Sequence, residues 1–124
     1  MYTSPIRFSA QAIIITPNGD IVLEDNKKIG RLSLIGGAKE ESDADENKNK
    51  EALNTIRREV WEELGILFDA ERFMFPQIQP ITRFGTGLWK STYFVLKITS
   101  QEIECILQND KIRCYSEMDL RENY

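Results

Sequence analysis

The sequence predicts a mixed α/β fold that forms one domain over residues 1–124. Several short segments rich in β-branched and aromatic residues are bounded by turn signals, and one long segment has the apolar spacing of a helix. The length agrees, because a chain of 124 residues with 41% hydrophobic residues buries roughly two thirds of its unfolded surface. Such a chain needs neither disulfides nor a structural metal for stability.

The first two strands are predicted on either side of a turn. Phe8–Ile15 (FSAQAIII) ends at the turn signal Thr16–Asp20 (TPNGD), after which Ile21–Leu23 resumes an apolar run. A short strand, Arg31–Ile35, then leads into a glycine pair at positions 36 and 37, where the backbone gains conformational freedom. We therefore expect three strands followed by a glycine loop.

A polar segment and a helix come next. Residues 38–50 (AKEESDADENKNK) contain no apolar residue larger than alanine, so we expect an exposed, mobile loop. The segment Glu51–Leu64 is predicted to be an amphipathic helix, and Gly65 supplies a left-handed C-cap. Its apolar residues recur at intervals of three, four and four, at Leu53, Ile56, Val60 and Leu64.

The second half of the chain contains two further predicted strands. Residues 68–75 mix aromatic and charged side chains ahead of Pro76 and Pro80, so this region is expected to be extended. Ser91–Thr99 (STYFVLKIT) is predicted to be a strand and Lys111–Tyr115 (KIRCY) a shorter one. The tail has room for one or two helical turns.

Composition excludes several kinds of chemistry. The absence of histidine excludes Ser-His-Asp and Cys-His catalysis, histidine general bases and zinc sites that need imidazole. The net charge of -4, from 16 basic and 20 acidic side chains, gives no overall positive field for nucleic acid or a membrane surface. Cys105 and Cys114 fit no disulfide framework and are expected to be thiols of a reducing cytosol. With no signal peptide and no long apolar run, we expect a cytoplasmic protein without a membrane partner.

Three carboxylates share one face of the predicted helix. At about 100° per residue, Glu59, Glu62 and Glu63 fall within roughly 100° of one another, beside the apolar stripe. Near the helix C-terminus these like charges repel one another and oppose the helix dipole, whereas a hard divalent cation takes such oxygen ligands. Arg58 can pair with one of them and fix its rotamer. A solvated acidic face is the alternative interpretation.

The upstream glycine pair favours the metal interpretation. Together with the acids it resembles the Nudix box, G-x5-E-x7-R-E-U-x-E-E-x-G-U with U aliphatic, in which a loop and a helix hold Mg²⁺ or Mn²⁺ against a diphosphate. The resemblance implies an α/β/α sandwich with a mixed sheet, short at its C-terminus. The second half of the box matches at every specified position: Arg58, Glu59, Val60, Glu62, Glu63, Gly65 and Ile66.

The first half of the box departs from the pattern. Five residues separate Gly37 from Asp43, an aspartate where the family has glutamate, and counting back from Arg58 puts Lys50 at the same place. We interpret the difference as a seven-residue insertion within the polar segment. Ile35 also stands where many members carry proline.

The resemblance implies hydrolysis of a diphosphate bridge in a nucleoside diphosphate linked to another moiety. The implied metal ligands are the carbonyl of Gly37 and the carboxylates of Glu59, Glu62 and Glu63. The implied catalytic set is Arg58, Glu62 and Glu63, with Glu63 the first candidate for the general base. Later acids are the alternative bases: Glu102, Glu104 and Asp110.

Substrate contacts are expected from residues outside the box. Arg31 and Arg83, together with Arg7 and Lys90, are candidates for phosphate contacts, because arginine offers a planar fork of donors. Phe84 and Trp89 lie among glycines and are candidates for base stacking, whereas Trp61 is expected to pack.

The expected partner is a small nucleotide, with a capped RNA end as the only nucleic acid and a homodimer in keeping with the family. Two alternatives are a Nudix-fold nucleotide-binding module that has lost hydrolysis and an unrelated α/β interaction domain with an acidic helix.

Overall fold

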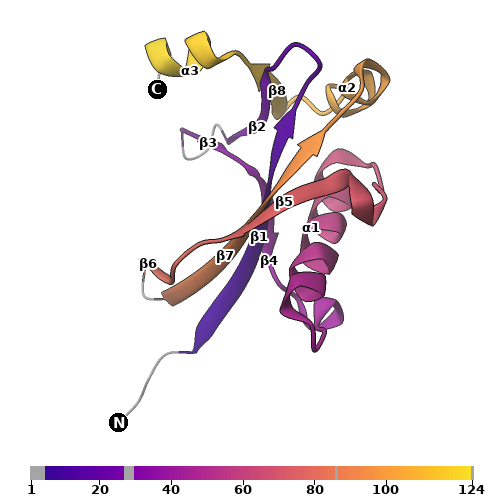
Figure 1. The fold of residues 1–124 in the computed structure, drawn as a ribbon. Helices are drawn as coiled ribbons and strands as arrows, with labels where there is room; N and C mark the ends of the chain where they lie inside the picture. Colours follow the sequence, from indigo (N-terminus) through magenta and orange to yellow (C-terminus); the bar gives the residue numbers. More distant parts are fainter. Residues whose placement is uncertain (1–4, 27–29, 86, 124) are drawn as a thin grey trace.

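The computed structural model describes residues 5–26, 30–85 and 87–123, and the described strands form one mixed sheet (Figure 1). The strands are β1 (Ile6–Ile15), β2 (Ile21–Asn26), β3 (Arg31–Ser33), β4 (Ile35–Ala38), β5 (Phe73–Ile78), β6 (Thr82–Phe84), β7 (Gly87–Lys97) and β8 (Ile112–Tyr115). The helices are α1 (Lys48–Leu64), α2 (Ser100–Ile106) and α3 (Glu117–Asn123), with 3₁₀ turns at Glu41–Asp43 and Ala70–Arg72. The sheet order is β3-β2-β1-β7-β5, with β4 paired to β1, β6 to β7 and β8 to β2.

Strand β1 is the centre of this sheet. It runs parallel to β7, from Ile6 opposite Leu88 to Ile15 opposite Lys97. It also pairs with β4 in the antiparallel sense, which sets the glycine pair against the middle of β1. A Cβ on Gly36 would lie 2.2 Å from the carbonyl oxygen of Ala10, so this close approach of two backbones requires glycine.

The core lies between the sheet and α1. Alternate residues of β1 point to opposite faces of the sheet, and on one face Ala10, Ala12 and Ile14 are completely buried. They belong to the same buried cluster as Ile56 and Val60 of α1. Ser9 and Gln11, which alternate with these residues along β1, face the other way.

Helix α1 has a defined start and end. The side chain of Asn47 caps the start by accepting hydrogen bonds from the backbone N–H groups of Asn49 at 3.0 Å and Lys50 at 3.2 Å. Gly65 ends the helix with φ 78°, the left-handed conformation that glycine adopts without a Cβ clash. The predicted helix and its C-cap are confirmed, although α1 begins three residues before Glu51.

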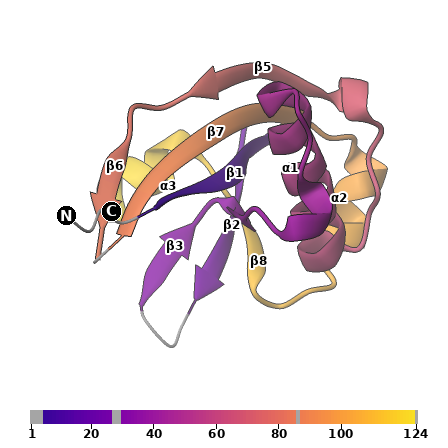
Figure 2. The same ribbon diagram turned by 90° about the horizontal axis from the view of Figure 1, so that it is seen from below.

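The helices flank the sheet on two sides. Figures 1 and 2 show α1 and α2 on one side of β1 and β7, and α3 on the other. On α2, Ile106 is 1% exposed and belongs to the core, against which Ile103 also packs. The α/β/α prediction is confirmed. None of the helices in the described residues is long and apolar enough to cross a membrane.

The prediction of a loop over residues 38–50 is partly wrong. Strand β4 extends to Ala38, a 3₁₀ turn covers Glu41–Asp43, and α1 already begins at Lys48. Asp43 is only 3% exposed, so the polar segment packs against the domain through this side chain. The prediction failed because the hydropathy of aspartate would place it in solvent. The sequence interpretation also missed α2 and β6.

Candidate functional site

The acidic face of α1 lies against the glycine pair of β4. A Cβ on Gly37 would lie 2.6 Å from both the carboxyl carbon and Oε1 of Glu59, so the bare glycine backbone leaves the space that this carboxylate occupies. The Glu59 side chain is 14% exposed, whereas that of Glu62 is 44% exposed. The fold thus sets the Glu59 carboxylate against the backbone of Gly37, although the polar segment and the first half of α1 separate the two residues in the sequence.

Glu63 is the most perturbed acid of this face. Its Oε2 is buried and has no hydrogen-bond partner among the described residues. Burial, followed by the negative charges of Glu24, Glu59 and Glu62, raises the pKa of Glu63 to about 7, against the opposing effect of a backbone hydrogen bond from Gly36. Glu24 comes from β2 and was not predicted, because only the pairing of strands brings it near the helix.

Arg58 donates hydrogen bonds to several acidic side chains at this site. Its Nε and Nη2 donate to the two carboxylate oxygens of Asp43, at 3.0 and 2.9 Å. Its Nη1 donates to Glu59 at 2.9 Å and to Glu62 at 3.1 Å, and Nη2 also reaches the carbonyl oxygen of Ala38 at 3.0 Å. Arg58 therefore sets the positions of two predicted metal ligands and ties them to the end of β4.

Asp43, expected in an exposed loop, is instead a buried partner of Arg58. Burial alone would raise its pKa, but hydrogen bonds from Arg58 and from the backbone N–H of Glu40 together hold the pKa below its ordinary value. The alternative residue, Lys50, lies in the first turn of α1 and pairs with Asp45 at 3.9 Å. Asp43 thus holds the side chain of Arg58 in position. Among the described ion pairs, none joins Lys50 to the acidic face.

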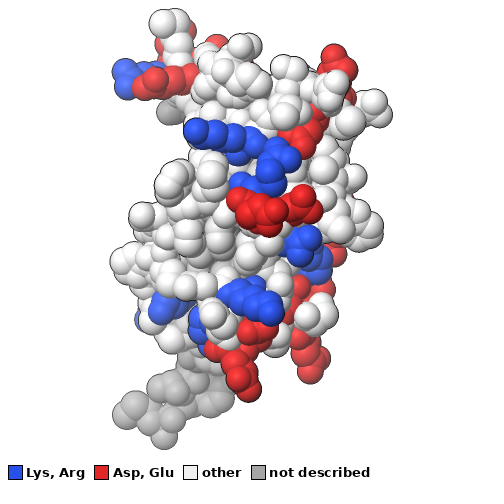
Figure 3. Space-filling view, turned by 45° about the vertical axis from the view of Figure 1, so that its right-hand side comes forward, with Lys and Arg blue, Asp and Glu red and all other residues white. Residues whose placement is uncertain are grey.

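The donor set suits a hard divalent cation, since carboxylate and carbonyl oxygens are the ligands that Mg²⁺ takes. The Oε2 of Glu63, which has no partner among the described residues, and the burial and neighbouring negative charges that raise the pKa of Glu63 both favour a cation at this face. Within the described ranges, however, no three acidic or cysteine side chains stand close enough together to hold one metal ion. Arg58 occupies oxygens of Glu59 and Glu62. On the face of the molecule that Figure 3 shows, acidic and basic side chains lie close to one another rather than in separate patches.

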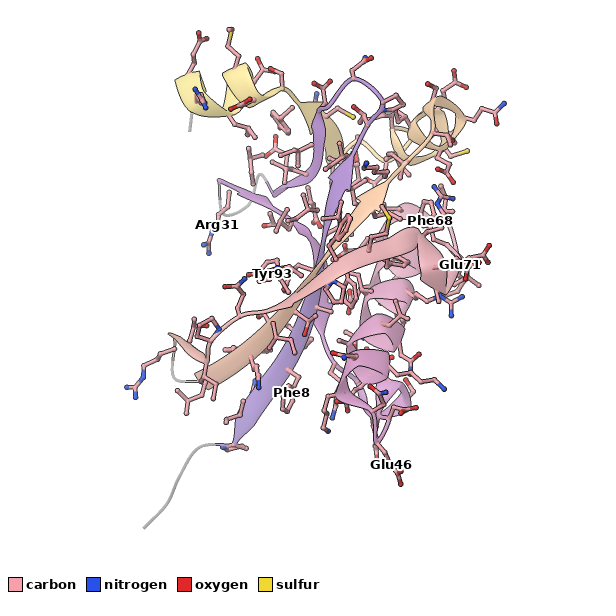
Figure 4. The ribbon with its side chains drawn as sticks, in the orientation of Figure 1. Phe8, Arg31, Glu46, Phe68, Glu71 and Tyr93 are labelled. Carbon is pink, nitrogen blue, oxygen red and sulfur yellow. The ribbon has the colours of Figure 1, made fainter. Side chains whose placement is uncertain are left out.

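A cleft of about 340 Å³ opens beside Gly37 on the sheet, a size typical of small-molecule sites. The predicted base-stacking residue Trp89 lines it, and the guanidinium carbon of Arg7 lies 5.8 Å from the centroid of that ring. Figure 4 shows Tyr93, a second aromatic residue of the cleft, on the side of β7 away from α1. The cleft is lined by Ser9, Gln11, Gly37, Ala38, Thr82, Trp89, Ser91 and Tyr93.

The other predicted contacts lie elsewhere. Arg31 is exposed on β3, on the other side of β1 from α1 in Figure 4, and Arg83 is exposed on β6. Lys90 lines a separate cleft with Lys39, Lys48 and Glu51. The side chain of Phe84 lies outside the described residues.

The later acids and Trp61 differ from expectation. Arg72 donates to both carboxylate oxygens of Glu102, at 3.1 and 2.7 Å, and Glu102 also caps α2, so this acid has a structural role. Glu104 is exposed on α2, and Asp110 lines a cavity beside β8. Trp61 is 54% exposed, so the prediction that it packs is wrong.

No protein-family model matches the sequence, and no curated protein matches it significantly. Solved structures do match the fold. The C. elegans Ap4A hydrolase has a TM-score of 0.63 at 13% identity, covering 94% of this chain and 84% of that one. The Nudix domain of Shewanella oneidensis NrtR, solved with ADP-ribose, has a TM-score of 0.63 at 13% identity, and the match covers 97% of this chain and 79% of that one.

A third match carries a metal ion in its structure. It is a bifunctional NMN adenylyltransferase/ADP-ribose pyrophosphatase from Francisella tularensis, solved with AMP and a Mn ion, with a TM-score of 0.58 at 20% identity. The match covers 79% of this chain and 29% of that longer chain. Together these likenesses show that the chain has the Nudix fold.

Proposed function

We propose that this chain with the Nudix fold hydrolyses the diphosphate bridge of a nucleoside diphosphate linked to another moiety, with Mg²⁺ or Mn²⁺ as cofactor. The observation that carries the proposal is the packing of Glu59 on Gly37, together with a buried oxygen of Glu63 that has no hydrogen-bond partner in the described part of the chain. The structural neighbours solved with ADP-ribose, or with AMP and a Mn ion, support a nucleotide as the substrate and a divalent cation as the cofactor.

The ligands proposed for the cation are the carboxylates of Glu59, Glu62 and Glu63 and the carbonyl oxygen of Gly37. When bound, such a cation supplies neutralisation of phosphate charge and activation of water. Arg58 positions Glu59 and Glu62 through its two Nη1 hydrogen bonds, at 2.9 and 3.1 Å.

Glu63 is the proposed general base. Its Oε2 accepts the proton of the water whose oxygen attacks one phosphorus of the bridge, while the bond from that phosphorus to the bridging oxygen breaks. With a cation bound beside it, the Glu63 carboxylate would be ionised and able to take up this proton. The cleft beside Gly37 is proposed to hold the rest of the substrate.

A nucleotide-binding module without hydrolysis is the second candidate. It is favoured by the two hydrogen bonds of Arg58 to Glu59 and Glu62 and by the lack of a three-acid group in metal-holding geometry within the described part of the chain. This candidate predicts nucleotide binding with no turnover at any metal concentration.

The test is hydrolysis of a substrate panel by the intact chain. Nucleoside triphosphates, ADP-ribose, dinucleoside polyphosphates and capped RNA are incubated with Mg²⁺ or Mn²⁺, and the products are separated by chromatography. We expect metal-dependent release of a nucleoside monophosphate or pyrophosphate from at least one substrate. Removal of one carboxylate ligand by Glu62→Gln should lower kcat by about 100-fold or more.

Glu46→Gln is the matched control, because Glu46 is an exposed acid that precedes α1 and lies at the far end of the helix from Glu62 (Figure 4). It should retain full activity. Normal activity of Glu62→Gln would exclude the proposed metal site. A folded wild-type protein that hydrolyses no member of the panel, but whose Tm rises with nucleotide, would favour the binding module.

A further inference from the structure

The cleft beside Gly37 is built from matched rows of side chains on β1 and β7. The parallel register sets Ser9 opposite Ser91 and Gln11 opposite Tyr93. These residues share the face of the sheet away from the core, because they alternate along β1 and β7 with core residues such as Ala10, Ala12 and Phe94. The cleft therefore has a polar row on β1 and an aromatic row on β7.

The aromatic row has room for one planar ring. Trp89 and Tyr93 both line the cleft and are separated by Ser91, a residue without a bulky side chain. Because alternate residues of a strand stand about 6.6 Å apart, the two aromatic residues are about 13 Å apart along β7 and leave the space over Ser91 open. A planar heterocycle that lies over Ser91 can contact the face or edge of either aromatic side chain.

The polar row ends in an unsatisfied acceptor. The Nε2 of Gln11 donates to Ser9 Oγ at 3.3 Å, and Ser9 Oγ lies 2.6 Å from Ser91 Oγ. The Oε1 of Gln11 is buried and has no partner among the described residues. A shielded acceptor without a partner is unfavourable, and an N–H donor from a ligand would remove that penalty. Gln11 lines the cleft, and its terminal amide turns about a torsion with a broad minimum. Such a turn would present Oε1 to a ligand in the cleft in exchange for the long hydrogen bond from Nε2 to Ser9.

We propose that this cleft binds the nucleobase of the substrate and that Gln11 is a specificity-determining residue, whose Oε1 accepts a hydrogen bond from an N–H group of the base. This inference rests on the proposed function in taking a nucleotide as the ligand. It adds which part of the nucleotide enters the cleft and which hydrogen-bonding group the base must present.

The test measures binding without hydrolysis. The chain has two tryptophans, and Trp61→Phe leaves Trp89, which lines the cleft, as the single tryptophan. AMP, GMP, CMP and UMP are titrated in EDTA, so that neither a metal nor a diphosphate bridge is involved. We expect at least one to change the fluorescence of Trp89. The analogue of the tightest binder with its base N–H groups methylated should bind about tenfold more weakly.

Gln11→Met in the same background should give a similar weakening of about tenfold, with no further loss when the methylated analogue is used. Gln101→Met is the matched control, because Gln101 is exposed on α2. The comparison of the two nucleotides in the unaltered cleft needs no variant of Gln11, so a folding defect in Gln11→Met cannot obscure the result.

Two results would overturn the inference: no fluorescence change with any mononucleotide, or equal affinity for the methylated and unmethylated ligands. Neither result bears on hydrolysis, which the substrate panel tests separately. Conversely, Glu62→Gln should bind mononucleotides normally in EDTA even if it hydrolyses nothing.

Discussion

Arg58 is the residue on which the geometry of the acidic site depends most. It is flanked by Asp43, Glu59 and Glu62, and its own side chain is only 16% exposed. Hydrogen bonds to Asp43 and Glu59 outweigh burial and raise the pKa of Arg58 further above its already high value, so it stays charged at every accessible pH. One side chain thus links the polar segment, the end of β4 and the acidic face of α1.

Replacing Arg58 tests this role. Arg58→Met should lower the free energy of unfolding by roughly 3 kcal/mol, because it leaves the buried carboxylate of Asp43 without its charged partner. Urea unfolding measures the loss. The double variant Asp43→Asn/Arg58→Met should recover part of it, and Arg121→Met, which alters an exposed pair on α3, should change stability by less than about 0.5 kcal/mol. Equal losses in the single and double variants would show that Asp43 does not depend on Arg58.

Helix α1 shows what local sequence determines at the scale of an element. The spacing of its apolar residues and the glycine at its C-cap both lie within one continuous segment of the sequence, and both were predicted. The signal for α2 was also present, since Thr99 and Glu102 form a capping box across four residues, although that helix was missed. By contrast, three features depend on segments that are far apart in the chain. They are the burial of Asp43, the approach of Glu24 to Glu63, and the Gln11 oxygen that has no partner among the described residues. No pattern of neighbouring residues in the sequence predicts such contacts.

The start of α1 can be tested with two variants that are expected to change the free energy of unfolding differently. Asn47→Ala removes the side-chain oxygen that accepts two backbone N–H groups and should lower the free energy of unfolding by about 1 kcal/mol. Asn49→Ala makes the same substitution two residues later, where the side chain is exposed within the helix. It should leave stability equal or slightly higher, because alanine has the better helix propensity. Chemical denaturation with unchanged m-values would measure both, and similar losses in the two variants would contradict the capping assignment.

At the scale of the whole molecule, acids with opposite pKa shifts set how stability depends on pH. The pKa of Glu63 is raised, so the folded protein binds its proton more tightly than the unfolded chain does. Its contribution to stability is fully present below the unfolded value of about 4.5 and is lost as the pH rises through about 7. The pKa values of Asp43 and Glu51 are lowered despite burial, so their contributions are present above the unfolded values and are lost in acid.

We therefore expect Tm to be highest in mildly acidic solution and to fall between about pH 5 and pH 8. Thermal unfolding at several pH values measures this profile. Glu63→Gln should flatten the fall, because the neutral amide does not titrate. Profiles of the same slope for both proteins would show that Glu63 is not responsible. Added Mg²⁺ should stabilise the wild-type protein more at pH 8 than at pH 6, because the cation competes with the proton for this carboxylate.

The parallel pairing of β1 with β7 also bears on how the protein is made. Ser9 meets Ser91, 82 residues later in the chain, and at about 5–20 residues per second a ribosome needs roughly 4–16 s to synthesise that interval. One edge of β1 can pair with β2 and β4 soon after these strands are synthesised. The other edge stays unpaired until β7 has been synthesised. A nascent chain halted between these strands displays the unpaired backbone N–H and C=O groups of a strand whose side chains are largely apolar, which is the kind of surface that recruits chaperones or aggregates.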